Sequence, residues 1–437
     1  PIDISIQNKN RLESPGIIAK LYLENGTLEK INNSSDKALQ NFEEGLKIYE
    51  TKNDHKGQLD ALRNIAIIYR DTNRYTEALE VIEHALVLSK EHNFEMTTEL
   101  IYTVLGNIYE RMGNYEQALQ AHTRAFDINK RLNNRFAIAK NHGNLGITLQ
   151  KMGKLEEAIQ HYEKALMIGI ETGNRSLEAN QLLHLGNLHS TLGNYEDAIN
   201  LYTRSQVIAK KINDKKQVGY LFCNIGTCYG KQGLYDDAIT SYQQALQVGK
   251  EIKDIHIEGL TLGNLGDIYM NLGNFERAKD YLEQAIEVGT QSGFLVGVEA
   301  FKGSLALILA KEDKITRAIY LIETQGSEIQ KYPYEYAKYL CKCAQIYHMA
   351  QRKELAQQYF LSAKRIISEI KLDEKSELHK IIQNTQNILQ LKNQIEESKD
   401  QIRLQAKRLL ERGNLEEAES LFDKALDCYH QAQELYI

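Results

Sequence analysis

The feature that most constrains this chain is an internal repeat of 40 residues. The stretch from Ala139 to Leu166 is its clearest copy, and its small residues Gly146 and Ala158 return in register in seven repeats. A fixed period of this length predicts one array of stacked repeats rather than two or three separate globular domains. The first column reads Ala66, Gly106, Gly146, Gly186, Gly226, Gly266 and Ala306, and the second reads Ala78, Ala118, Ala158, Ala198, Ala238, Ala278 and Ala318.

Each repeat contains two amphipathic segments separated by a turn. In the clearest copy, Gly153 divides two runs whose apolar residues recur with helical spacing. Glycine can adopt the left-handed conformation that ends a helix, and with only 3 Pro in 437 residues little interrupts the helices. Connections this short favour antiparallel neighbours. The sequence therefore predicts an all-α fold of tandem antiparallel helix pairs.

A large residue follows the second column and should meet the next pair. It is tyrosine at Tyr162, Tyr202 and Tyr242, while His122 takes the same place, where we expect it at the boundary of the core. Four segments follow from the register. They are residues 1–57, a degenerate capping repeat with a first helix opening at Pro15 and a long turn from Asn25 to Ser35; 58–330, seven regular repeats; 331–373, a divergent repeat that slips by two residues; and 374–437, a long helix and a terminal repeat-like pair.

Composition argues against several classes of partner. The net charge of −6 and the pI near 6.1 provide no basic surface of the kind that nucleic acid or an anionic membrane attracts. No apolar run approaches the roughly 20 residues that cross a bilayer. The 5 cysteines lack zinc-site spacing, and their odd number fits free thiols in a reducing compartment. We therefore expect a cytoplasmic protein that binds neither nucleic acid nor membrane.

The sequence shows no pattern typical of catalysis or metal binding. His184 and His189 are five positions apart and do not share a helix face, and no carboxylate completes a site. Cys341 and Cys343 are two apart and point to different faces of a helix. The glycines lie at helix contacts and turns rather than in a phosphate-binding loop. We predict no enzymatic activity, no metal and no cofactor.

This arrangement of residues resembles the tetratricopeptide repeat family. The resemblance covers nearly the whole chain, although the repeat has 40 residues rather than the usual number of about 34. Repeats of 40 residues resemble those of Pins-type polarity adaptors and kinesin light chains. It implies a right-handed superhelical α-solenoid in which the first helix of each pair lines a concave groove that binds extended peptides. The residues that carry it in the clearest copy are Gly146, Leu149, Gly153, Ala158, Tyr162 and Ala165.

On such a concave surface, the residue two positions before the first column should project into the groove, and a second row follows three residues later. Asparagine recurs in both rows, and its amide can satisfy the backbone of an extended ligand. The alternative is that these asparagines only suit the packing of this repeat length. The predicted peptide-binding residues of the two rows are Asn64, Asn107, Asn144, His184, Asn187, Asn224 and Asn264.

Basic residues near the same face allow two interpretations. They indicate either a modest preference for acidic ligands or ordinary solvated charges, and the mixture of signs around them favours the second. Chaperone-tail clamps of this family hold a terminal carboxylate with lysine and asparagine, but the corresponding positions here, Thr103, Asn107, Asn144, Asn180 and His184, lack a basic residue of that clamp. The basic candidates are Arg63, Arg70, Lys140, Lys151 and Lys231.

The sequence thus predicts a non-enzymatic scaffold that binds an extended peptide segment of a partner protein in its concave groove. An alternative is a sensor or regulatory arm of a larger signalling protein, such as a kinase, a transcription regulator or a caspase-like protease. A further possibility is self-association through the C-terminal helices from Lys375 to Ile437.

Overall fold

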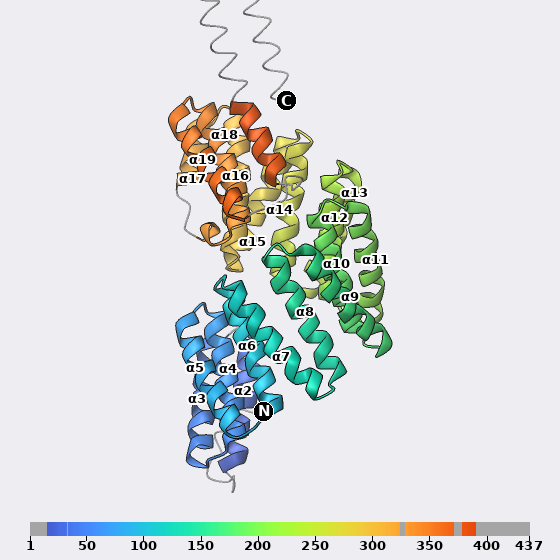
Figure 1. Cartoon of the computed structure of the whole chain (residues 1–437). Helices are drawn as coiled ribbons and strands as arrows, with labels where there is room; N and C mark the ends of the chain where they lie inside the picture. The colour runs from blue at the N-terminus through green and yellow to red at the C-terminus, as the bar shows by residue number, and fades with distance from the viewer. Residues whose placement is uncertain (1–14, 33, 324–327, 371–377, 390–437) are drawn as a thin grey trace, which may run out of the picture. The chain divides into compact units, whose positions relative to one another are not determined.

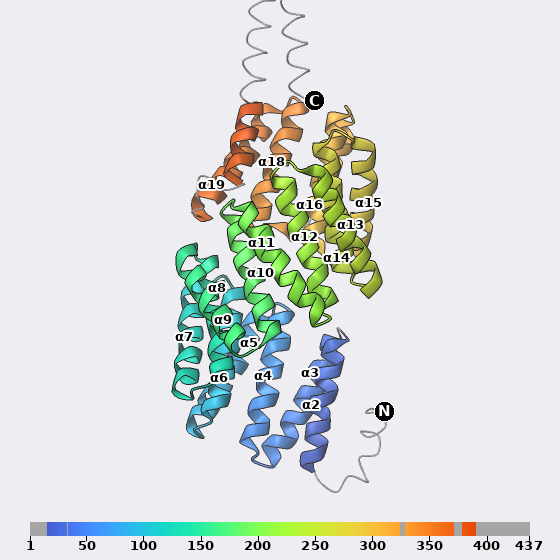
Figure 2. The same cartoon turned by 90° about the vertical axis from the view of Figure 1, so that its right-hand side faces the viewer.

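The computed structural model describes residues 15–32, 34–323, 328–370 and 378–389. These ranges are helical and contain no strand, and within each of the two compact units defined below consecutive helices lie side by side (Figures 1 and 2). The predicted all-α fold of tandem helix pairs is confirmed. The helices are α2 (Pro15–Ile31), α3 (Ser35–Thr51), α4 (His55–Asp71), α5 (Tyr75–Glu91), α6 (Glu95–Arg111), α7 (Tyr115–Arg131), α8 (Arg135–Lys151), α9 (Leu155–Glu171), α10 (Arg175–Thr191), α11 (Tyr195–Lys211), α12 (Lys215–Lys231), α13 (Tyr235–Ile252), α14 (Ile255–Asn271), α15 (Phe275–Gln291), α16 (Leu295–Lys311), α17 (Ile315–Glu323), the short 3-10 helix η2 (Ile329–Lys331), α18 (Pro333–Met349) and α19 (Lys353–Ile370).

The same three-residue turn separates almost all of these helices. A helix begins every 20 residues from Pro15 to Ile315, and most helices have 17 residues. The middle residue of the turn has a positive φ both within pairs, as at Gly153 (φ 77°), and between pairs, as at Asn133 (φ 53°). A left-handed residue lets the following N–H groups bond back to the last helical carbonyls. The 40-residue repeat is therefore two helix-plus-turn segments of equal length.

The first pair is more regular than its sequence suggests. The predicted long turn from Asn25 to Ser35 is wrong, because α2 continues to Ile31. Gly26 lies inside this helix and belongs to the glycine column, where an added Cβ would come 2.6 Å from Cε1 of the fully buried Phe42. Burial of this aromatic ring against Gly26 stabilises the helical conformation there.

The column glycines make room for a large side chain in the second helix of the same pair. A Cβ on Gly146 would lie 2.6 Å from Cε1 of Tyr162, whose side chain is fully buried. A residue with a side chain at this position would force the two helices apart. The same relation joins Gly186 to Tyr202, Gly226 to Tyr242 and Gly266 to Leu282.

Contacts divide the chain into two compact units, residues 1–185 (unit 1) and 186–437 (unit 2), and the boundary falls within α10. Within the described part of each unit, first helices of successive pairs contact one another, α4 with α6 in unit 1, and α12 with α14 and α14 with α16 in unit 2. The first helices therefore form the inner side of each unit. We call the surface that they expose there the inner face.

The predicted C-terminal segments lie largely outside the described residues. Residues 378–389 are helical, whereas the remainder of the long helix and the terminal repeat-like pair, and with them most of the segment proposed for self-association, are not described. None of the helices in the described ranges is both long and apolar enough to span a bilayer.

Candidate functional site

In unit 1 the predicted asparagines are half-buried on the first helices, but their bonding differs. Asn64 of α4 donates from Nδ2 to the carbonyl oxygen of Asp60 in its own helix, at 2.9 Å. The side chains of Asn107 on α6 and Asn144 on α8 form no hydrogen bond with any other described residue. Two amides on this inner face are therefore able to pair with a ligand.

His184 has a packing role in the structure. Its ring stacks on Tyr162 with 5.2 Å between the ring centroids and an interplanar angle of 9°. Burial lowers the pKa of His184, because a low-dielectric environment disfavours the charged imidazolium. The residue is thus a neutral, stacked imidazole at neutral pH, and it differs from the asparagines that share its row.

In unit 2 two of the three predicted asparagines bond to each other. Asn187 Oδ1 accepts from Asn224 Nδ2 at 3.1 Å and from the Tyr202 hydroxyl at 2.8 Å. These bonds connect α10 to α12 and to α11. Asn264 of α14 is half-buried, and its side chain has no hydrogen-bonding partner in the described part of the chain. Asn264 is the open amide of this inner face.

Three of the basic candidates have local partners. An Arg63 nitrogen lies 3.4 Å from Asp60, and Arg70 Nη2 lies 2.6 Å from Asp71 Oδ1. The Lys140 ammonium stands 4.5 Å from the centroid of the Phe136 ring. Exposed pairs of this kind contribute little free energy. For these three residues the local pairing favours the interpretation as solvated charges.

Lys151 belongs to a polar cluster around Glu110, whose side chain is only 11% exposed. Glu110 accepts a hydrogen bond from Thr148 and one from Lys151 Nζ at 3.4 Å, and His122 Nε2 lies 3.7 Å away. The expectation that His122 lies at the core boundary is wrong, because it is completely buried and neither ring nitrogen is hydrogen-bonded. Burial lowers its pKa, and Glu110 opposes this effect.

Lys231, the last basic candidate, is within electrostatic range of two lysines of α18, Lys338 and Lys342, that sequence reasoning missed. Asp267 accepts from Ser304 at 2.7 Å, and Lys342 donates to Ser304 at 2.6 Å. Lys338 lies one turn before Lys342 on α18. Alignment of the columns overlooked these two lysines because α18 belongs to the repeat that slips by two residues. A search for polar residues 37 or 38 positions apart would have found Lys342.

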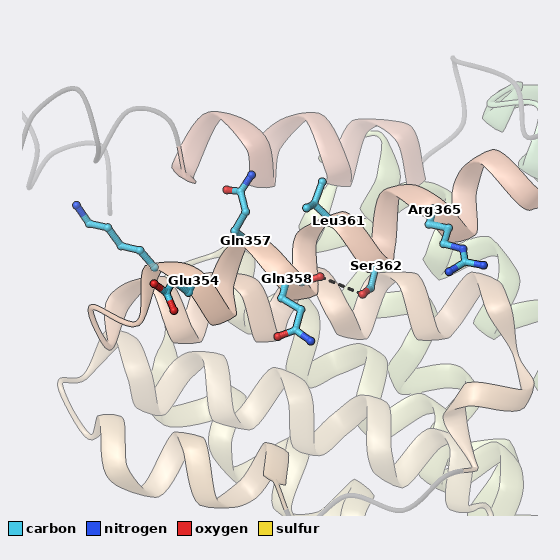
Figure 3. A pocket seen from close by; sticks show the side chains of 7 residues that line it. Glu354, Gln357, Gln358, Leu361, Ser362 and Arg365 are labelled. Carbon is cyan, nitrogen blue, oxygen red and sulfur yellow. Dashed lines mark hydrogen bonds between the residues drawn. The ribbon is translucent and has the colours of Figure 1, made fainter.

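The hollows on the described surface include one in each unit. One, of about 510 Å³, is in unit 1 between α2 and α4; it includes Arg63 and Asn64 and has acidic and basic side chains in its wall. The other, of about 670 Å³, follows one side of α19 and contains none of the predicted residues (Figure 3). No group of three or more potential metal ligands occurs within the described ranges.

Comparison with known sequences matches most of the chain to a single family model. The model described as tetratricopeptide repeat matches residues 18–91, 97–171, 136–211, 177–251 and 217–291. A second model of the same description matches residues 406–432. No curated protein matches the sequence.

Solved structures with the same architecture have low sequence identity to this chain. Aspartyl phosphate phosphatase F from Bacillus subtilis has a TM-score of 0.56 and 17% identity, covering 81% of this chain and 95% of its own. The Rap conjugation gene regulator of plasmid pLS20, in complex with the Phr* peptide, has a TM-score of 0.51 and 14% identity, covering 82% and 97%. A STAND signal-transduction ATPase with a tetratricopeptide repeat sensor, from Pyrococcus horikoshii, has a TM-score of 0.53 and 19% identity, covering 80% and 50%. At these identities the likeness concerns the fold.

Proposed function

Because the chain belongs to the tetratricopeptide repeat family, we propose that it is a scaffold that binds an extended peptide segment of a partner along its inner faces and acts without catalysis. The observation that carries this proposal is the presence of open amides on first helices, namely Asn107, Asn144 and Asn264. A primary amide offers both donors and an acceptor to a peptide backbone. An extended backbone has matching groups on every residue.

The structural neighbours support the same proposal. One protein of similar fold, the Rap regulator of plasmid pLS20, was solved with the Phr* peptide. The half-buried position of the amides also favours ligand binding, because a hydrogen bond sheltered from water contributes more than one at an exposed position. Asn187 and Asn224 then connect neighbouring helices, and Asn64 bonds within its own helix, rather than contact the ligand.

The test begins with affinity capture of partners by the whole chain and mapping of the bound segment. Replacement of Asn107, Asn144 and Asn264 by alanine should lower the affinity for that segment by more than about tenfold, since each net hydrogen bond contributes about 1 kcal/mol. Helical content should remain unchanged. The control is Asn200→Ala, an exposed asparagine on the second helix α11, which should bind normally. Equal affinities for the triple variant and the control would refute the role of the amides.

A second candidate function is a sensor arm of a larger signalling protein. The STAND ATPase favours it, because that protein has a tetratricopeptide repeat sensor and this chain covers only 50% of it. The complete reading frame that encodes this chain discriminates between the candidates. An adjoining ATPase, kinase or protease domain would support the sensor arm, whereas a frame without one would leave the scaffold.

A further inference from the structure

Two histidines meet between the helices α8 and α9. His142 of α8 and His161 of α9 are 19 positions apart in the chain, and 3.0 Å separates their Nδ1 atoms, one of which donates a hydrogen bond to the other. The ring planes meet at 62° with 5.0 Å between the centroids. His142 is buried and His161 is half-buried. The two rings therefore approach one another through their nitrogens, in a place largely shielded from water.

No other regular repeat has histidine at either of these positions. Two repeats earlier, Leu62 and Val81 stand there and belong to one hydrophobic cluster. Three repeats later, Leu262 and Tyr281 do the same. Burial of an apolar side chain is favourable, whereas a buried imidazole loses its hydrogen bonds with water. Because the other repeats pack without them, two histidines in contact indicate a role other than packing.

The separation of the two nitrogens suits a shared metal ion. Imidazole nitrogens bind transition-metal ions at about 2.0–2.1 Å. Two such nitrogens on one ion are therefore about 2.9–3.4 Å apart when the angle at the ion is between about 90° and 110°. The observed 3.0 Å lies in this range. It lies towards the right angle of the square-planar and tetragonal geometries that Cu²⁺ and Ni²⁺ adopt.

The packing around the pair fixes the position of these nitrogens. The ring of His142 lies against Phe126 of α7, with 5.0 Å between the centroids. One turn after His142, Gly146 packs closely against the ring of Tyr162, the residue that follows His161. This contact sets the spacing of α8 and α9 next to the histidines. Ligands held in place by their surroundings lose little freedom when an ion binds.

At neutral pH His142 is in the uncharged form that binds metal. Burial, and then the neighbouring His161 ring and Lys164, lower the pKa of His142 to about 4, and a metal ligand must be a neutral imidazole. Lys164 lies one turn after His161 on α9 and repels a cation, whereas Glu157, one turn before it, attracts one. Both of these charged side chains are exposed, so salt screens their effects.

We propose that His142 and His161 form a binding site for a divalent late transition-metal ion, Ni²⁺, Cu²⁺ or Zn²⁺. The ion replaces the hydrogen bond between the two Nδ1 atoms, and the proton of that bond moves to Nε2 of the same ring. Water fills the remaining coordination positions, since no group of three or more potential metal ligands occurs in the described part of the chain. The sequence prediction of no metal compared residues close together in the chain, whereas these two meet only through the packing of α8 on α9.

The first experiment titrates the whole chain, without an affinity tag, with Ni²⁺, Cu²⁺ and Zn²⁺ in an isothermal calorimeter. We expect saturable binding of each ion and none of Mg²⁺, which prefers oxygen ligands. Absence of saturable binding for all three transition-metal ions would overturn the proposal.

The second experiment repeats the titration with His142→Leu and His161→Leu, singly and together. The next repeat has leucine at both positions, Leu182 and Leu201, so these variants should keep the fold, which circular dichroism checks. Each single replacement should weaken binding at least about tenfold, because even outer-shell partners of a metal contribute that much. His84→Leu, at an exposed histidine of α5, is the matched control and should bind normally. Equal affinities for the double variant and the control would overturn the site.

The third experiment identifies the ligands by electron paramagnetic resonance of bound Cu²⁺. The spectrum should show nitrogen coupling from two imidazoles in the unchanged protein and from one in His161→Leu, and an identical spectrum in the two would exclude His161. An ion that binds only the folded protein also raises its Tm. Ni²⁺ should therefore raise the Tm of the unchanged protein but not that of the double variant, and an equal rise in both would contradict the proposal.

Discussion

Two glycines on one helix should respond in opposite directions to the same substitution. Gly259 and Gly266 both lie within α14 and both are buried. A Cβ on Gly266 would come 2.6 Å from Cγ of Leu282 and 3.3 Å from the carbonyl oxygen of Ala278, both on α15. A Cβ on Gly259 would have its nearest neighbour at 3.5 Å, an ordinary contact with Val288.

The magnitudes follow from these distances. Replacing a helical glycine by alanine stabilises a helix by about 0.5–1 kcal/mol, because the unfolded chain loses freedom. Gly259→Ala should gain this amount. Gly266→Ala gains it too, but carbon atoms prefer a separation of about 3.5–4.0 Å, so α15 must move by roughly 1 Å. Overpacking of this kind costs about 1–3 kcal/mol. The net effect of Gly266→Ala should be a loss of about 1–2 kcal/mol.

Thermal unfolding followed by circular dichroism measures both variants. One kcal/mol corresponds to a Tm change of about 2–4 °C in a domain of 150–250 residues, and to a smaller change in a longer chain. We expect a higher Tm for Gly259→Ala and a lower one for Gly266→Ala. Leu282→Ala should lower the stability less in the Gly266→Ala variant than in the unchanged protein. The reason is that the methyl group introduced at position 266 occupies part of the cavity that the leucine leaves. A Gly266→Ala variant as stable as Gly259→Ala would refute the packing account.

Two further predictions concern buried and capping groups. His122→Tyr should raise the urea midpoint by the equivalent of about 1 kcal/mol, because it removes a buried imidazole that makes no hydrogen bond. It also introduces the tyrosine that other repeats have at this position, where the Tyr162 hydroxyl donates to Gln150 at 3.0 Å. A lower urea midpoint would refute this. For Asp254, burial opposes ionisation, but Lys216 at 2.8 Å and backbone N–H groups lower its pKa below the usual 3.8. Its carboxylate therefore stabilises the fold above that value and ceases to do so as the pH falls through the lower pKa of the folded protein. Asp254→Ala should lower the free energy of unfolding by about 1 kcal/mol at pH 7 through loss of the helix cap. The difference in urea midpoint between the variant and the unchanged protein should shrink towards pH 2, and a difference that stays constant with pH would contradict this role of Asp254.

The periodicity of small residues was sufficient to predict the helix pairs, and the family model agrees with it. Gly146, Gly153 and Ala158 recur because close helix contacts and left-handed turns tolerate few other residues. The turn predicted at Asn25 was wrong for a related reason. Local composition there resembles a turn, but burial of Phe42 against Gly26 favours the helical conformation.

The candidate site was less predictable. The columns placed the asparagines on first helices, yet they could not distinguish Asn264, whose amide is open, from Asn224, whose amide bonds to Asn187. That difference depends on whether a side chain of the neighbouring helix stands within hydrogen-bonding distance. The peptide-binding role of these residues stays a prediction.

The sequence by itself determined the repeat, the all-α fold and the family, because each depends on short-range patterns of residues that recur in every repeat. Only the tertiary structure decided which polar groups meet. Asp267, Ser304 and Lys342 are separated by 37 and 38 positions and belong to three different helices. Whether their side chains come together depends on how those helices pack. Many residues contribute to that packing, so it cannot be predicted from the sequence of a single repeat.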